Sequence, residues 1–232
     1  MRRFALILGL ALSLAGCVPT ATAPVVAPKL TPQQAAMNFR DVIARVEPVA
    51  EQLCQERTPD QPCDFAIYVD GAPQKGVNAF HTIDEAGRPA IIFTLGLITM
   101  AENADELAFV MGHEAGHHIG RHLPQVRARA DLGAEVFAQI ARAGGASDRA
   151  VGEVAQIGAA VVARQFSRQA ELDADAIGTI IALRAGYDPL RGAAFFARIP
   201  DPARNFMATH PPNAERMETV RRTVAETRRP LL

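Results

Sequence analysis

The segment His113-Glu114-Ala115-Gly116-His117 is the part of this 232-residue chain from which we predict its fold. The two histidines are four residues apart, so on a helix they differ by about 40° around the axis and point the same way. Two neutral imidazoles on one helix face are suitable zinc ligands, and Glu114 beside them can serve as a general base. Asn103 and Glu106 predict where the helix begins, because they have the spacing of an N-cap and its partner.

A zinc site needs a third protein ligand, which this segment does not contain. One class of zinc peptidase would place a histidine at position 123, but this chain has Leu123 there. The downstream segment Glu171-Leu172-Asp173-Ala174-Asp175 offers a carboxylate instead. We therefore predict that Glu171 and the two histidines bind one zinc ion per chain, as in gluzincin-type sites. Asp175 follows one helical turn later and can accept a hydrogen bond from a ligand imidazole.

The composition is that of an ordinary globular protein, with 49% hydrophobic and 21% charged residues. The net charge of −1 does not indicate a nucleic-acid partner. The sequence has no tryptophan and only two tyrosines, while alanine and glycine are abundant, which favours closely packed helices over a large sheet. We predict a mostly helical α+β fold of the zincin type, with a small edge sheet of about three strands.

Residue patterns place the elements along the chain. Alternating, β-rich segments predict strands, and apolar segments of helical period predict helices. The long helix expected to start at residue 149 should end before Gly186 and Pro189. We expect it to be a core helix rather than a membrane span, because polar residues interrupt it. The expected strands are residues 65–69, 76–82 and 89–94, and the expected helices after the histidines are residues 131–143 and 149–181, separated at Gly144-Gly145.

The first residues predict export and lipid attachment. Arg2 and Arg3 precede an apolar run that is too short to span a bilayer but has the length of a signal-peptide core. Leu14-Ala15-Gly16-Cys17 resembles a bacterial lipobox, in which cleavage precedes the cysteine and lipid is attached to its thiol. The alternative is an ordinary secretory signal with an incidental cysteine. An aspartate directly after the lipid-modified cysteine usually retains a lipoprotein in the inner membrane, but this chain has Val18 at that position. We therefore expect an outer-membrane lipoprotein facing the periplasm of a Gram-negative bacterium.

The chain is thus expected to have three parts. Residues 1–16 are the signal peptide, residues 17–30 form a proline-rich tether, and residues 31–232 form a single domain. Cys54 and Cys63 lie close together in that domain, so an oxidising periplasm would allow a disulfide between them. The alternative is a pair of free or buried thiols.

Several further motifs occur together with the histidine segment. On them, the chain resembles the HtpX- and Oma-type zinc metallopeptidases, which are related to the CAAX-prenyl proteases, and within them the bacterial periplasmic lipoprotein branch. The motifs follow the family's order and cover about residues 65–220, but no transmembrane helices or further repeat domain are expected here. The matching segments are Asn78-Ala79-Phe80, residues 113–122, Arg168-Gln169-Ala170-Glu171 with Ala174-Asp175, Gly186-Tyr187-Asp188-Pro189 and Thr209-His210-Pro211-Pro212.

The resemblance implies roles for residues outside the metal ligands. Asn78, Ala79 and Phe80 would form the sheet edge beside the cleft, where a substrate strand adds through its backbone. His210 would enter the cleft and donate a hydrogen bond to the oxyanion of the reaction. The alternative for His210 is a turn histidine in front of two prolines.

Five other polar residues have two alternative roles or positions each. His118 and His122 are a second pair four residues apart, which we expect to support the ligands or pack in the core. His81 either lines the cleft or is exposed. Arg216 either anchors the His210 loop or forms a surface salt bridge. Arg168 either pairs with Glu171 or the cleft rim, or lies on a solvated helix face.

The resemblance implies a zinc metalloendopeptidase that hydrolyses peptide bonds of unfolded or misassembled cell-envelope proteins. The expected partners are polypeptide substrates, the membrane through the N-terminal lipid, and the outer-membrane assembly machinery. The alternative is a zinc-stabilised periplasmic chaperone or assembly scaffold that rarely cleaves.

Overall fold

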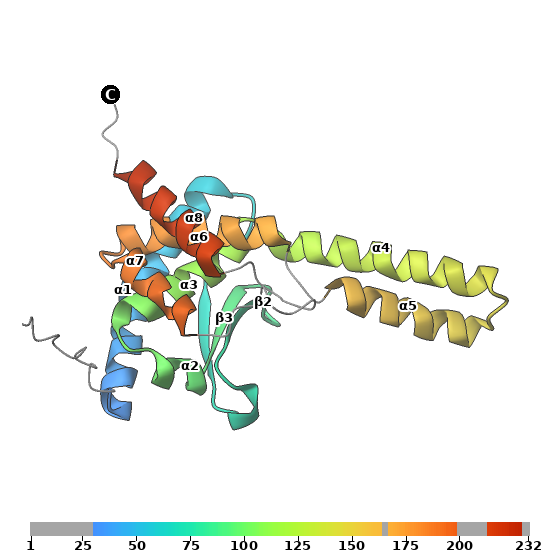
Figure 1. The fold of residues 1–232 in the computed structure, drawn as a ribbon, viewed down its shortest axis with the longest axis horizontal. Coiled ribbons are helices and arrows are strands. Elements are labelled where there is room, and N and C mark those ends of the chain that lie inside the picture. Colours follow the sequence, from blue (N-terminus) through green and yellow to red (C-terminus); the bar gives the residue numbers. More distant parts are fainter. Residues whose placement is uncertain (1–29, 164–166, 199–212, 229–232) are drawn as a thin grey trace, which may run out of the picture.

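The computed structural model describes residues 30–163, 167–198 and 213–228 (Figure 1). Its helices surround one face of a small sheet, and one helical hairpin extends away from them. This mostly helical α+β arrangement confirms the predicted fold class. The elements are α1 Pro32–Arg57, β1 Ala66–Asp70, the 3-10 helix η1 Pro73–Lys75, β2 Ala79–Ile83, β3 Pro89–Thr94, α2 Leu95–Met100, α3 Ala104–Ile119, α4 His122–Ala143, α5 Asp148–Ala163, α6 Arg168–Arg184, α7 Pro189–Ala193, the 3-10 helix η2 Ala194–Ala197 and α8 Asn213–Thr227.

The three predicted strands form one mixed sheet in the order β1-β3-β2. β1 is parallel to β3, with Ala66 opposite Ala90, and β2 is antiparallel to β3, with His81 opposite Ile91. β3 is therefore central, and β2 has one free edge within the sheet. The predicted strand positions are confirmed to within a few residues.

Helix α3 is the centre of the molecule, and most of its residues are buried. α1 packs on one side of it and α6 on another. The α3–α6 contact is close because small residues line it. A Cβ at Gly112 would lie 2.8 Å from the carbonyl oxygen of Gly178, and a Cβ at Gly116 would lie 2.8 Å from that of Ala174. The glycines of α3 thus allow α6 to bring its carboxylates next to the α3 histidines.

Helices α4 and α5 form a long antiparallel hairpin that projects from the rest of the fold (Figure 1). The sequence predicted one helix over residues 149–181, and this was wrong. α5 ends at Ala163 and α6 begins at Arg168, where the Ser167 side chain accepts from the amide of Ala170 as an N-cap. α5 is also not a core helix, because Ile157 and Val161 are more than half exposed. Within the described residues, no helix is both long enough and apolar enough to span a membrane.

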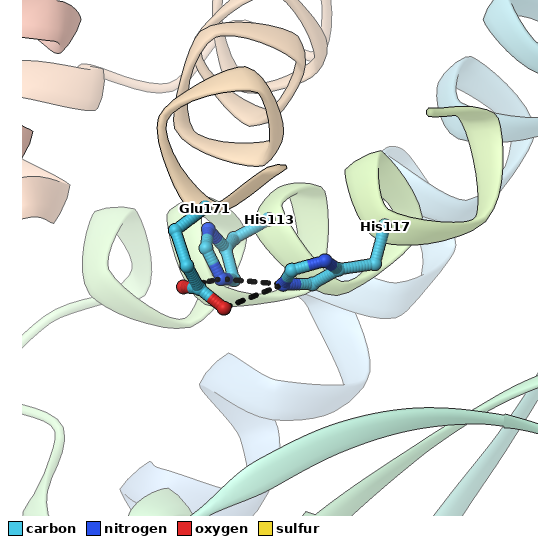
Figure 2. A group of neighbouring side chains, drawn as sticks. All are labelled: His113, His117 and Glu171. Atoms are coloured by element: carbon cyan, nitrogen blue, oxygen red, sulfur yellow. Dashed lines mark hydrogen bonds and ion pairs between the residues drawn. The ribbon is translucent and has the colours of Figure 1, made fainter. Parts of the chain in front are cut away.

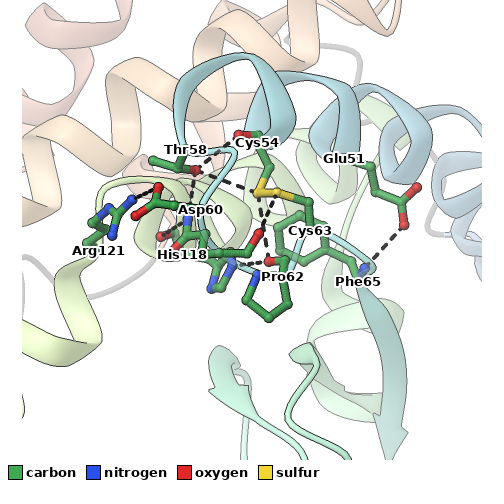
Figure 3. Close-up of a disulfide and its surroundings, with 10 residues drawn as sticks. Glu51, Cys54, Thr58, Asp60, Pro62, Cys63, Phe65, His118 and Arg121 are labelled. Atoms are coloured by element: carbon green, nitrogen blue, oxygen red, sulfur yellow. Dashed lines mark hydrogen bonds and ion pairs between the residues drawn. A yellow bond between two sulfur atoms is a disulfide. The ribbon is translucent and has the colours of Figure 1, made fainter.

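Cys54 and Cys63 form a disulfide, which confirms that prediction (Figure 3). It joins the last turns of α1 to the segment that leads into β1. In this segment the carbonyl oxygen of Pro62 lies 2.7 Å from Nε2 of His118 on α3. The cross-link therefore ties α1, the start of the sheet and the C-terminal end of α3 together.

Candidate metal centre and cleft

Helix α3 places two imidazoles on one side. It begins at the Asn103 cap, whose side-chain oxygen accepts from the amide of Glu106 at 3.2 Å, as predicted. His113 and His117 then lie one turn apart, and Glu171 of α6 points toward both rings (Figure 2). All three side chains are buried, and their ligand atoms lie within 4.8 Å of one another.

The distances within this group fit a tetrahedral metal. Nε2 of His113 lies 3.1 Å from Nε2 of His117, and the two nitrogens lie 3.5 and 3.6 Å from the Oε2 and Oε1 atoms of Glu171, respectively. Tetrahedral ligands about 2.0–2.1 Å from zinc would lie about 3.3–3.4 Å apart. Two imidazoles and one carboxylate are also the donor set of zinc sites that keep a fourth position for reactants. The residues therefore fit a zinc ion.

Electrostatics at His113 favour positive charge. Burial lowers the pKa of this imidazole, but hydrogen bonding with Asp175 and Glu171 outweighs burial and raises the pKa to about 9. At His117, burial dominates and holds the pKa well below its ordinary value. The site thus stabilises a cation at His113, whether a proton or a metal ion, and keeps His117 neutral, as a ligand must be.

Asp175 supports His113 from behind. Its Oδ1 lies 2.9 Å from Nδ1 of His113, so the ring can donate there and direct Nε2 toward Glu171. Arg216 of α8 donates to both oxygens of the same carboxylate, at 2.7 and 2.8 Å. Although burial raises the pKa of Asp175, the Arg216 charge lowers it below its ordinary value. Asp175 is therefore an anion, and it orients the imidazole.

Glu114 lies beside the ligands and is buried. Burial raises the pKa of its carboxyl to about 7, while a hydrogen bond from the main chain of His81 on β2 acts in the opposite direction. A carboxyl group titrating near neutrality is suited to accept and return a proton. It lies between the metal-ligand group and the edge strand.

A cavity of about 370 Å³ opens beside Glu114 and extends along the start of β2. Thr94 donates its amide to the carbonyl oxygen of Asn78 at 2.9 Å, which makes these two residues a hydrogen-bonded pair. Such pairs alternate along an antiparallel ladder, so the main-chain groups of Ala79 and His81 point away from β3. The other cavity residues are mostly apolar: Val77, Leu97, Met100, Phe109, Val110, Phe195 and Phe196, with His113, Arg198 and Arg216.

His118 and His122 lie on different helices, although they are only four residues apart. α3 ends at Ile119, and Arg121 has a left-handed backbone with φ 54°, so His122 begins α4 instead. His118 packs against Phe65, with ring centroids 5.4 Å apart. His122 lies against His117, with the two Nδ1 atoms 3.0 Å apart.

His81 is buried rather than exposed, and neither of its ring nitrogens has a hydrogen-bond partner among the described residues. Burial lowers the pKa of His81 to about 3, so its ring is neutral. It lines a second cavity of about 250 Å³, on which His117 and His118 also border.

The two arginines also have defined positions. Arg216 is almost fully buried, so it is not a surface salt bridge, and its partner Asp175 lies 41 residues earlier. Arg168 pairs with Glu215 of α8 and not with Glu171. No local pattern indicated the role of Arg216, because it depends on how α8 packs on α6.

Two predicted residues lie outside the described part of the chain. His210, with its neighbours Thr209, Pro211 and Pro212, falls in residues 199–212, and Cys17 falls in residues 1–29. Their predicted roles, and the signal peptide and tether, stay predictions.

Comparisons with known proteins agree with this geometry. Residues 36–224 match peptidase family M48. A curated relative, the mitochondrial metalloendopeptidase OMA1 of Arabidopsis thaliana, is 29% identical over 144 residues. The match covers 60% of this chain and 28% of the relative, so the chain spans little more than a quarter of that protein.

Proposed function

The chain belongs to peptidase family M48, whose members are zinc metallopeptidases, and on this premise we propose that it is a zinc-dependent metalloendopeptidase. We assign its substrates to unfolded or misassembled proteins of the cell envelope. The observation that supports the activity is the buried group of His113, His117 and Glu171, whose spacing suits one zinc ion beside a cleft.

Bound zinc would supply Lewis-acid activation of a water molecule and of the substrate carbonyl. Glu114, which is buried beside the ligands, would take the proton of the attacking water and pass it to the leaving amine. Asp175 holds His113 in the tautomer that presents Nε2, and Arg216 keeps Asp175 ionised. His210 donates a hydrogen bond to the oxyanion that develops on the carbonyl, as the family resemblance implies.

The edge strand β2 favours extended, unfolded substrates. The outward main-chain groups of Ala79 and the outward carbonyl of His81 can pair with a substrate strand and thereby recognise backbone rather than particular side chains. The N–H of His81 instead donates to Glu114. The apolar cavity beside Asn78 and Ala79 can receive a hydrophobic side chain, and folded proteins keep most large side chains of this kind inside. An unfolded chain offers both features together.

Localisation follows from the lipobox resemblance. A lipid on Cys17 would anchor the domain in the outer membrane, facing the periplasm, through a tether of residues 17–30. The envelope substrates and the outer-membrane assembly machinery are then within reach of the cleft.

Casein hydrolysis tests the activity. The full chain carrying Cys17→Ser should cleave unfolded casein, lose this activity with a zinc chelator and recover it when zinc is restored. If the chain holds one zinc ion and prevents casein aggregation but leaves casein intact, the result would overturn the proposed hydrolysis and favour a chaperone or scaffold.

A further inference from the structure

The candidate ligand His117 is joined to two residues outside the metal group. Its Nδ1 lies 3.0 Å from Nδ1 of His122, and Nε2 of His122 lies 3.2 Å from Oδ2 of Asp173. The His122 ring is buried, whereas the Asp173 side chain is 48% exposed. The three side chains thus form a hydrogen-bonded chain from the metal site to the surface of α6.

The protons along this chain can be assigned in order. A metal held by Nε2 of His117 would leave the ring proton on Nδ1, which donates to Nδ1 of His122. His122 must then accept at Nδ1, so its own proton is on Nε2. Oδ2 of Asp173 accepts the hydrogen bond from that N–H. With the His117 proton on Nδ1, only the Nε2-protonated tautomer of His122 can make both of its hydrogen bonds.

We propose that His122 and Asp173 are positioning residues, which hold His117 in the tautomer and orientation that present Nε2 to the metal. This inference rests on the proposed zinc site. Partners behind a ligand histidine commonly fix its tautomer, and their loss typically weakens metal binding by about 10–100-fold. His122 acts here through His117 and does not itself reach the metal group.

The backbone between α3 and α4 is shaped for this contact. Arg121 has a left-handed φ of 54°, which reverses the chain after α3 and returns His122 toward His117. Gly120 leaves the space that the ring fills. A Cβ at Gly120 would lie 2.6 Å from Cε1 of His122 and 3.0 Å from Oδ2 of Asp173. Gly120 has right-handed backbone angles, φ −75° and ψ 0°, which residues with a side chain also adopt. A glycine is therefore needed here to leave room for the His122 ring and not for the backbone conformation.

The two ligand imidazoles are therefore held in different ways by one turn of α6. Asp175, paired with Arg216, contacts His113 directly, whereas Asp173 reaches His117 only through His122. Glu171, on the same turn, completes the metal group. This segment thus provides one ligand and the carboxylates behind both of the others.

Gly120→Ala gives the sharpest test, because alanine keeps the helical backbone but displaces the His122 ring. The matched control is Gly152→Ala on α5, where an added Cβ would meet nothing within 4 Å. Zinc affinity is measured by competition with a chromophoric chelator, and folding of the metal-free proteins by circular dichroism. We expect zinc affinity to fall about 10–100-fold in Gly120→Ala and to stay unchanged in Gly152→Ala.

Substitutions of His122 distinguish positioning from packing. His122→Ala should weaken zinc binding as Gly120→Ala does. His122→Asn should keep affinity within about threefold of the wild type, because its amide oxygen can accept from His117 near the former Nδ1. Long-range ¹H–¹⁵N NMR of the zinc form should show the His117 proton on Nδ1.

Folded Gly120→Ala and His122→Ala proteins with wild-type zinc affinity would overturn the inference, as would His122→Asn binding as weakly as His122→Ala. These readouts do not require proteolysis. A chain that binds zinc as described but cleaves no peptide would contradict the proposed function alone. Cleavage with unchanged affinity in the two alanine variants would contradict the positioning role alone.

Discussion

Arg216 of α8 donates two hydrogen bonds to Asp175 of α6, and Nη2 of this arginine also lies 3.2 Å from Nδ1 of His113. A buried ion pair is thereby in direct contact with a candidate zinc ligand. Removing one member of such a pair leaves an uncompensated charge in the interior, which is strongly destabilising. The pair therefore links the stability of the α6–α8 contact to the metal site.

Asp175→Asn should lower zinc affinity by about 10–100-fold. Asparagine can still accept from His113, but it cannot provide the negative charge that favours a cation there. Zinc competition against a chelator measures the change in protein that circular dichroism shows to be folded, since Arg216 loses its buried counter-charge. Glu153→Gln on the exposed surface of α5 is the control. Equal zinc affinity in the two variants would argue against a supporting role for Asp175.

Loss of the disulfide should lower the free energy of unfolding by about 2–3 kcal/mol, as the chain-entropy model gives for its ten-residue ring. The Cys54→Ala, Cys63→Ala double variant is compared with the wild type by denaturant unfolding. The difference should disappear when both proteins are unfolded in a reductant. An unchanged unfolding free energy under oxidising conditions would mean that the cross-link does not stabilise the fold.

His210→Ala should lower kcat by about 10²–10³-fold and hardly change KM, if the side chain binds the oxyanion only in the transition state. Pro211 and Pro212 restrict the backbone around it, which suits a preorganised donor. Zinc content and Tm should stay near wild type. A turn histidine would instead cost stability and leave kcat per folded molecule intact, which would remove His210 from the mechanism.

Cys17→Ser should release the protein from membranes, because no other anchor is proposed. Cell fractionation with detection of the protein measures this. If the variant stayed in the outer membrane, the lipid assignment would be wrong.

The sequence was informative wherever local spacing determines position. His113 and His117 share a helix face by periodicity, and the Asn103 cap places the start of that helix. The Glu171 segment could be recognised as a motif, although only the glycine-lined α3–α6 contact brings it to the histidines.

Other features depend on tertiary geometry and have no local signal. The approach of His122 to His117 requires the left-handed turn at Arg121, and the partner of Arg216 depends on helix packing. The prediction that α5 belongs to a core helix is wrong, because α5 packs mainly on α4 and leaves large side chains exposed. The spacing of hydrophobic residues indicates a helix, but it does not show how much of the helix surface is buried by other elements.

Zinc content measured beside casein cleavage, in two single variants, tests the central claim most directly. Glu114→Gln removes a base and no ligand, so it should retain about one zinc ion per chain and lose proteolysis. Glu171→Ala removes a ligand, so it should lose most of its zinc as well as its activity. A zinc-free Glu114→Gln protein together with a fully loaded Glu171→Ala protein would contradict the assignment of the metal site.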